Sequence, residues 1–446
     1  MIAGAEPIVQ YLDEKRLFRK IELKIIPFIF ITFIIAFLDR INIGFAQVQM
    51  QVDLGFNDAI YGLAAGIYFL GYFFFEVPSN LFLQRVGAKI TFMRIMILWG
   101  ITSVCMAFVR TPTQLYVVRF FLGVFEAGFF PGIVLYLSYW FPSTRRAGVV
   151  SWMIVGSAVS GVVGGIASGY IMHYMNGMLS LPGWQWMFIV EGGPAVVLGV
   201  LAYWAIEDRP VAATWLTDSE KRTLTTILEA EYEAKQTTSS HSLLQALRDR
   251  RLYALSAIYF AATCGPIAIA FWLPAMIKTA GASGSMQVGL YSAIPYIIGV
   301  VGIIYLTKHS DARKERRGHY AFCTIGAAVA LLTLPHIAGH LVAILLALGL
   351  AVALTFSLIP IFWAVPPDYL SGTAAAGGIA VISSIGQLGS FSGPTMIGWI
   401  KMSTGSVNNG LYFLALMLLL SGAGMTWLLR HDNRYGKKVS PLSSTT

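Results

Sequence analysis

Residues 119–146 read RFFLGVFEAGFFPGIVLYLSYWFPSTRR. Glu126 is the one charged residue of this stretch between Arg119 at its start and Arg145 and Arg146 at its end. A helix needs roughly 20 apolar residues to cross a bilayer, and the run is too long for a strand of a membrane barrel. The stretch therefore predicts a membrane-spanning helix that carries Arg119 and Glu126.

The composition of the whole chain agrees with a membrane protein. The 446 residues are 56% hydrophobic and only 12% charged, and the mean hydropathy is +0.68. A soluble domain usually carries about 25% charged residues. These values argue against a soluble enzyme, a nucleic-acid binder and a disordered protein. The three cysteines lie in apolar stretches and form neither a disulfide framework nor a metal-binding spacing, so no metal site is predicted.

Similar apolar segments recur along the chain, six before and six after one long hydrophilic stretch. We predict an all-α transmembrane fold of twelve helices in two pseudo-symmetric six-helix bundles. The first bundle, with an amphipathic N-terminal segment, takes residues 1–206, a cytoplasmic linker 207–251, the second bundle 252–430, and a cytoplasmic tail 431–446. The predicted spans run near 24–46, 59–79, 88–109, 113–138, 146–170, 185–206, 252–277, 285–307, 318–336, 341–365, 373–400 and 407–430.

The basic residues predict the orientation. Most of the 31 lysines and arginines fall in the N-terminal segment, the linker, the tail and the turns on the same side. Such residues gather in cytoplasmic loops, which places both termini inside the cell. The first apolar run is too long for a signal-peptide core and lacks a cleavage site. We therefore expect a multi-pass protein of the inner (plasma) membrane of a bacterium, in contact with the lipid bilayer and with no nucleic-acid partner.

Charged side chains inside the predicted spans are concentrated in the first half. A charge at the bilayer centre costs about 2.5–3.5 kcal/mol on insertion scales, which makes such residues functional candidates. Asp39 and Arg40 are neighbours and point about 100° apart on a helix, so each should face a different partner. Arg119 and Glu126 are two turns apart, roughly 10 Å, a gap that suits an anion or a relay through Asp39 and Arg40. The alternative is a purely structural network of buried charges.

Other polar side chains give secondary candidates. Glu76 lies one turn from Tyr72, and an interfacial position for it is equally compatible with the sequence. Glu191 precedes two glycines and a proline, and is either a second proton site or, the favoured alternative, a structural acid. The histidines lie mostly in loops, and none is predicted to carry protons. The polar side chains inside the predicted spans of the second half are neutral and include Trp363, Ser383 and Gln387.

Two short basic turns occupy matching places in the two halves. The turn after the second span contains Arg85 and Lys89, and the turn after the eighth contains Asp311, Arg316 and Arg317. We predict that these turns are gating loops rather than ordinary topology signals.

The balance of buried charge suggests a coupling scheme. Both arginines stay protonated at any accessible pH, and Asp39 and Glu126 neutralise them when ionised. Protonation of the two acids then leaves a positive site that attracts an organic anion, whose carboxylate fits a guanidinium in a bidentate manner. The scheme predicts proton-driven uptake of a carboxylate, with Asp39 and Glu126 as proton-coupling residues and Arg40 and Arg119 as anion-binding residues.

Four stretches together resemble the major facilitator superfamily, and within it the anion:cation symporter family of tartrate- and phthalate-type carriers. They are residues 119–146, DRINIG at 39–44, GWQWMFIVEG at 183–192 and ISSIGQLG at 382–389. The resemblance implies a rocker-switch fold that moves hydroxy acids, sugar acids or aromatic acids by alternating access. It adds Tyr72 to the substrate site, together with Trp363, Ser383 and Gln387. Gln84 stands where the superfamily's gate motif usually has an acid, and Ser383 where the family usually has asparagine.

Three other functions compete with this symporter. A metabolite or drug exporter (a proton antiporter) would share the fold, although two buried arginines argue against cationic drugs. A transporter-like sensor would bind without flux. A membrane enzyme is disfavoured because the sequence contains no metal cluster, nucleophile elbow or cofactor loop. We therefore predict no enzymatic activity and no cofactor, a proton gradient as the driving force, and a chain that functions as a monomer.

Overall fold

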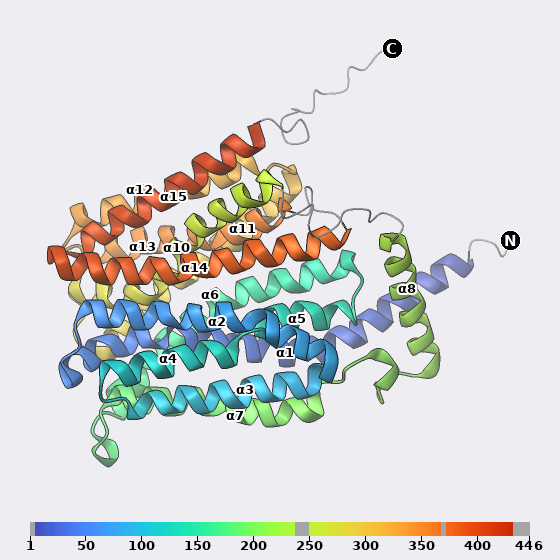
Figure 1. Ribbon diagram of the computed structural model, residues 1–446, viewed down its shortest axis with the longest axis horizontal. Coiled ribbons are helices and arrows are strands. Elements are labelled where there is room, and N and C mark those ends of the chain that lie inside the picture. Colours follow the sequence, from blue (N-terminus) through green and yellow to red (C-terminus); the bar gives the residue numbers. More distant parts are fainter. Residues whose placement is uncertain (1–4, 237–248, 367–371, 431–446) are drawn as a thin grey trace, which may run out of the picture.

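Helices dominate the computed structural model, which describes residues 5–236, 249–366 and 372–430, and no β-strand occurs in these ranges (Figure 1). Of the helices in these ranges, 11 are long and apolar enough to cross a membrane. Helix α14 (Gly372–Thr404) occupies the remaining predicted segment. The predicted all-α transmembrane architecture is confirmed. The predicted tail, 431–446, and part of the predicted linker lie outside the described residues.

The helices follow one another with short connections. The first half contains α1 (Ala5–Leu54), α2 (Asp58–Val86), α3 (Ala88–Cys105), η1 (Met106–Phe108), α4 (Pro112–Glu126), α5 (Phe129–Ser138), α6 (Ser143–Tyr174), η2 (Met178–Ser180) and α7 (Gly183–Ala205). The connection between the halves contains η3 (Pro210–Ala212) and α8 (Asp218–Gln236). The second half contains α10 (Arg250–Thr279), α11 (Gly284–Arg313), α12 (Arg317–Thr333), η4 (Leu334–Ile337), α13 (Leu341–Trp363), α14 and α15 (Val407–Arg430).

One predicted span is two helices. Residues 113–138 were expected to form a single helix, but α4 ends at Glu126 and α5 begins at Phe129. Gly128 between them has φ +83°, a left-handed conformation that glycine adopts without the steric cost of a Cβ atom. The break places the Glu126 carboxyl group at a helix end in the middle of the span.

Close helix contacts hold each half together and join the two halves. In the first half α3 packs on α7, α2 on α4, and α1 on both α6 and α7; in the second half α10 packs on α14, α11 on α13 and α12 on α15. The halves meet where α2 packs on α14 and α6 on α11. Both crossings rely on glycine: a Cβ atom on Gly62 would lie 2.9 Å from the Gly398 Cα, and one on Gly169 would lie 2.9 Å from the Gly289 Cα. Small residues allow such backbone approach in membranes.

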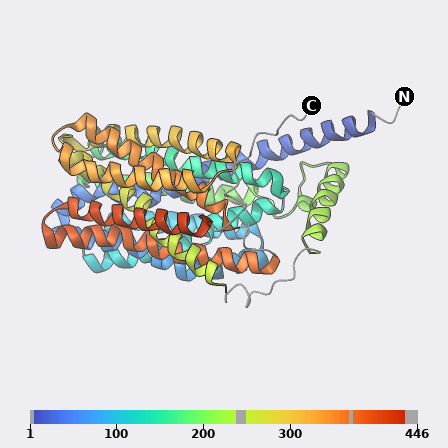
Figure 2. The same ribbon diagram turned by 90° about the horizontal axis from the view of Figure 1, so that it is seen from above.

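The two ends of the bundle differ. Helix α8 lies across one end, where α1 begins and α15 ends, and we call this the linker end and the opposite one the far end (Figures 1 and 2). The Lys20 Nζ of α1 lies 2.7 Å from the Glu220 Oε2 of α8, and the Trp140 and Trp215 rings stack with centroids 5.6 Å apart. Along the sides, tryptophans such as Trp204 (68% exposed) face outward, as expected for contact with lipid.

Candidate functional site

Asp39 and Arg40 leave α1 in different directions, as predicted. The Arg40 Nη2 forms an ion pair with the Glu126 Oε1 at the end of α4. Two tyrosine rings of α2 flank the guanidinium, with the Arg40 Cζ 5.3 Å from the Tyr68 centroid and 5.6 Å from the Tyr72 centroid. Cation–π contacts contribute about 0.5–2 kcal/mol, more when water is excluded. Arg40, Glu126 and Tyr72, predicted from the sequence, therefore lie together.

Asp39 faces α3 instead. Its carboxyl group accepts hydrogen bonds from the Trp99 Nε1 at 2.7 Å, the Ser103 Oγ at 2.9 Å and the Asn42 Nδ2 at 3.3 Å. None of the ion pairs among the described residues includes Asp39. Asp39 thus makes no direct ion pair with a buried arginine among the described residues, because α1 turns this side chain towards donors that carry no charge. Its predicted role in neutralising the buried arginines stays a prediction.

Arg119 is the most unusual side chain of the site. It is fully buried (0% exposed), and its Nε donates to the Ala64 carbonyl oxygen at 3.1 Å. Both terminal nitrogens, Nη1 and Nη2, are buried without a hydrogen-bond partner among the described residues. Nearly all buried polar groups in proteins are hydrogen-bonded, and an unmet charged donor is costly. A guanidinium that presents two free nitrogens in the interior is equipped to receive an anion.

Aromatic residues from both halves surround Arg119. Its Cζ lies 5.2 Å from the Tyr68 centroid and 5.9 Å from that of Phe271 on α10. The Tyr61 hydroxyl of α2 donates to the Phe271 carbonyl oxygen at 2.9 Å, which links the halves here. Tyr61, Tyr68 and Phe271 were not predicted from the sequence. The spacing of Tyr61, Tyr68 and Tyr72, seven and then four residues on one face of α2, is the signal that could have identified them.

The candidates of the second half lie nearer the linker end. The Trp363 Nε1 donates to the Tyr259 hydroxyl at 3.1 Å, and the Ser383 Oγ donates to the Glu76 Oε1 at 3.4 Å. Glu76 is 8% exposed, so the structure places it in the protein interior. Gln387 is partly buried one turn from Ser383 on α14. These residues form a second polar group, separate from Arg40, Arg119 and Glu126.

Polar contacts join the two halves at the far end, and a cavity lies between the halves at each end of the bundle. At the far end the Lys401 Nζ lies 2.8 Å from the Asp58 Oδ1, and the Gln49 Nε2 donates to the Ser285 Oγ at 3.1 Å. Towards the linker end a cavity of about 230 Å³ opens between α6, α11 and α13, and its lining includes Trp152, Ile303, Thr307, Lys308 and Pro360. A second cavity of about 250 Å³ lies at the far end between α1, α6 and α11, beside the Gln49–Ser285 contact, so each end of the bundle has open space between the halves.

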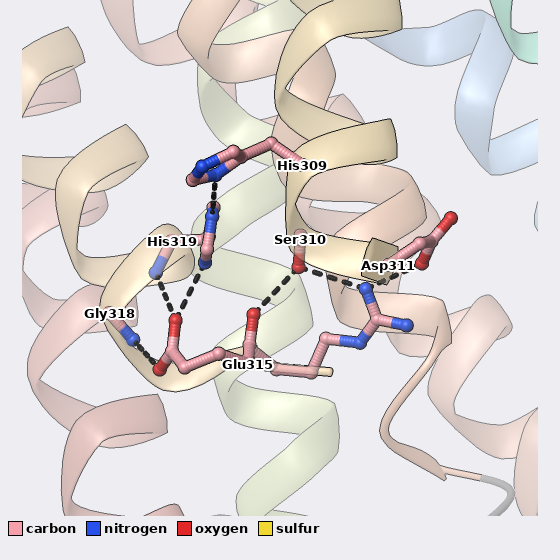
Figure 3. A network of polar contacts seen from close by, with 7 residues as sticks. His309, Ser310, Asp311, Glu315, Gly318 and His319 are labelled. Carbon is pink, nitrogen blue, oxygen red and sulfur yellow. Dashed lines mark hydrogen bonds and ion pairs between the residues drawn. The ribbon is translucent and has the colours of Figure 1, made fainter. Parts of the chain in front are cut away.

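The predicted gating loop after α11 is well ordered by ion pairs. The Arg316 Nη1 lies 2.6 Å from the Asp311 Oδ1 and donates to the Ser310 Oγ at 2.8 Å. Arg317 starts α12. Figure 3 shows how Asp311 and Ser310 at the end of α11 approach the turn that leads to α12.

Two histidines extend this network. The His319 Nδ1 lies 2.6 Å from the Glu315 Oε2, and the His319 Nε2 lies 2.7 Å from the His309 Nδ1 (Figure 3). Burial raises the pKa of Glu315, but hydrogen bonds from the Gly318 and His319 backbone amides and the His319 ring outweigh it, so this pKa lies below its ordinary value. This pairing could not be predicted from the sequence, because the two rings meet only across the turn.

The turn after α2, which corresponds to the turn after α11, is contacted by an acidic side chain from the segment that follows α7. Arg85 is exposed, whereas the Lys89 Nζ lies 4.2 Å from the Tyr203 ring centroid. The backbone N–H of Lys89 donates to the Asp208 Oδ1 at 2.8 Å. Asp208, which follows α7, thus places a carboxylate at this turn, where the local sequence has Gln84.

Known proteins resemble this chain along most of its length. A family model described as the Major Facilitator Superfamily matches residues 29–394. A putative tartrate transporter of Agrobacterium vitis is 47% identical over 430 residues, which cover 96% of this chain and 98% of the relative. The metabolite transport protein NicT of Pseudomonas putida, itself described as putative, is 38% identical and covers 94% and 96%. A quinolone resistance transporter of Acinetobacter baumannii is 37% identical and covers 93% and 95%.

Solved structures share the fold at low identity. The xylose transporter XylE from E. coli, in a partially occluded inward open conformation, has a TM-score of 0.72 at 15% identity and covers 94% of this chain and 99% of that one. A bacterial homologue of the human lysosomal transporter Spinster, inward-facing and occupied, also has a TM-score of 0.72 at 15% identity, with 93% and 98% covered.

Proposed function

We propose that this chain, which belongs to the major facilitator superfamily, imports a small organic carboxylate together with protons. Membership makes it a multi-pass membrane transporter and not an enzyme. The observation that supports a carboxylate substrate is the buried Arg119 guanidinium, whose two terminal nitrogens have no partner among the described residues. Two parallel N–H donors match the two oxygens of one carboxylate.

The charges favour a hydroxy acid of the tartrate type, which carries two carboxylates. Arg119 is free to bind one of them, while Arg40 is occupied by Glu126. A proton on Glu126 would release Arg40 for the second carboxylate. The charges of the two arginines and of the dianion then cancel. This lowers the free-energy cost of enclosing the loaded site in the low-dielectric interior of the protein. Two relatives at 47% identity are described as putative tartrate transporters, which supports this substrate class.

The direction of transport follows from the same coupling scheme and from the distribution of the basic residues. We place the linker end in the cytoplasm of a bacterial cell, with both termini inside, because most lysines and arginines lie on that side. Substrate and protons enter when the far end is open and leave through the linker end. The proton gradient supplies the driving force, no cofactor takes part, and the chain functions as a monomer.

Export is the second candidate function. A relative described as a quinolone resistance transporter and the aromatic residues around Arg40 are compatible with a larger aromatic substrate. An exporter that exchanges substrate for protons would alkalinise a compartment as substrate enters it, whereas a symporter acidifies it. The sign of the proton movement therefore separates the two functions.

The test uses proteoliposomes that contain a pH-sensitive dye. We would add L-tartrate, sugar acids and aromatic acids to the wild type and to Arg119→Gln and Glu126→Gln. Symport predicts internal acidification by one of these acids in the wild type and none in either variant. Arg110→Gln is the matched control, because Arg110 is an exposed arginine just before α4 and should behave as wild type.

Substrate counterflow completes the test, because it needs no net proton movement. Glu126→Gln should retain counterflow of the labelled acid and lose its accumulation against a gradient. Alkalinisation in place of acidification would establish the exporter, and accumulation by Glu126→Gln would refute the coupling scheme.

A further inference from the structure

A second group of acids lies behind α1, away from the Arg40–Glu126 pair. Glu191 of α7 is 6% exposed, and its Oε1 accepts a hydrogen bond from the Ser168 Oγ of α6 at 2.7 Å. Asp39 and Asn42 of α1 are its other polar neighbours. Asn42 in turn donates to Asp39, so its amide lies between the two carboxyl groups.

Several hydrogen-bonding atoms of this group have no partner. The Glu191 Oε2 and the Asn42 Oδ1 are both buried and unpartnered among the described residues. An unpartnered acceptor in the interior costs about 1–3 kcal/mol, and more when it carries charge. A proton on Glu191 removes the charge and turns one of its oxygens into a donor.

The group itself contains no cation, and the charged side chains that act on it from outside are Arg119 and Glu126 of α4, both through Asp39. From α1 the titratable group that faces Glu191 is Asp39, while Arg40 is turned to Glu126. Helix α3 contributes Trp99 and Ser103 to Asp39, α6 contributes Ser168 to Glu191, and none of these is charged. No ion pair among the described residues includes Glu191.

Two carboxyl groups in one dry site without a cation do not both ionise. The donors decide where the charge lies. Asp39 accepts three hydrogen bonds and Glu191 accepts one, so Asp39 is the better-stabilised carboxylate. The remaining proton belongs on Glu191.

We propose that Asp39, Asn42 and Glu191 form one shared proton site, in which Glu191 holds the proton while Asp39 is ionised. Its members belong to α1 and α7 and their other hydrogen-bond donors to α3 and α6, so the site stays intact when the two halves move relative to each other. The substrate site, in contrast, includes Phe271 of the second half. The role of the shared proton site in transport rests on the proposed proton coupling, but the existence of this proton site does not.

Infrared difference spectroscopy on the purified full chain tests the site without any substrate. We expect a protonated-carboxyl C=O band that shifts in D2O, persists in Glu191→Asp and disappears in Glu191→Gln. Glu76→Gln is the control, since it removes a buried carboxyl group of the other polar group and should leave this band in place. If Glu191→Gln does not fold, Ser168→Ala removes the hydrogen bond to Glu191 and should move the same band. A spectrum unchanged in Glu191→Gln, or in Ser168→Ala, would overturn the proposal.

Transport gives a second readout. When the shared proton leaves the wild-type site, two carboxylates remain side by side, whereas Glu191→Gln leaves only that of Asp39. The variant therefore holds this proton less tightly, and its pH of half-maximal uptake should fall by on the order of one unit. Counterflow of labelled L-tartrate should remain in this variant. A pH profile identical to that of the wild type would reject the shared site. If no carboxylate is transported at all, the proposed function fails while the infrared result still decides the site.

Discussion

Replacing Arg119 with methionine separates a binding residue from a structural one. Methionine has a similar length and no charge, so Arg119→Met removes two buried donors that have no partner among the described residues. It also removes the hydrogen bond from Nε to the Ala64 carbonyl oxygen and two ring contacts. Removing the unpartnered donors stabilises the fold by about as much as losing the hydrogen bond and the ring contacts destabilises it. We therefore expect the substrate-free variant to be at least as thermally stable as the wild type.

Substrate binding should respond very differently. Each charge-assisted hydrogen bond contributes about 1.5–3 kcal/mol, so the loss of a bidentate contact weakens binding by about 3–6 kcal/mol, or roughly 100- to 10,000-fold. At a substrate concentration 100 times Kd the wild type gains about 2.7 kcal/mol of stability. The same concentration should stabilise Arg119→Met by less than about 0.5 kcal/mol.

Thermal unfolding in detergent, with and without L-tartrate, measures both effects. Arg94→Met is the matched control, because the Arg94 Nη2 has a partner in the Ser79 Oγ at 2.9 Å and its Cζ lies 4.4 Å from the Phe82 ring centroid. This variant should lose stability and keep the substrate-induced shift. The reasoning is refuted if Arg119→Met instead loses about 3–5 kcal/mol, as when a buried ion pair is broken, and keeps the shift.

Three further variants test the fold and its ends. Gly123→Ala should destabilise by about 1–3 kcal/mol in thermal unfolding, because its Cβ would overlap a carbonyl oxygen of α2, whereas Gly193→Ala, with open space around the Cβ, should not. Glu315 has a lowered pKa in the folded protein, so its ionised form stabilises the fold at pH values above the ordinary pKa of a glutamate. This stabilisation is lost as the pH falls through the lowered pKa, and Glu315→Gln should therefore reduce the decline of stability at acid pH. Lys401→Ala breaks a partly exposed pair with Asp58 worth about 0–1 kcal/mol, and should raise thiol labelling of cysteines placed at the far end by no more than about fivefold.

Much of the site could be found from the sequence because buried charge is rare. Arg40, Arg119 and Glu126 stand out in apolar segments, and the structure brings all three near the tyrosines of α2. Their pairing could not be predicted. Arg119 and Glu126 both lie within α4, so their two-turn spacing holds, but the partner of Glu126 is Arg40 of α1, which no spacing within one segment predicts.

The order of the helices and the extent of several of them follow from the amino-acid sequence alone. Hydrophobic length is local: the prediction of 407–430 coincides with α15, and 341–365 differs from α13 by two residues at one end. The class of transporter is likewise visible in short motifs.

What each charge contacts is decided only in three dimensions. Asp39 and Arg40 are adjacent in the chain, yet one meets α3 and the other α4, because a helix turns about 100° per residue and the partners come from distant segments. Glu191 joins Asp39 only because α7 packs on α1 and α3, and no pattern within either segment predicts that contact. The sequence therefore identifies the charged residues, and helix packing separates them into the proposed anion site and the proposed proton site.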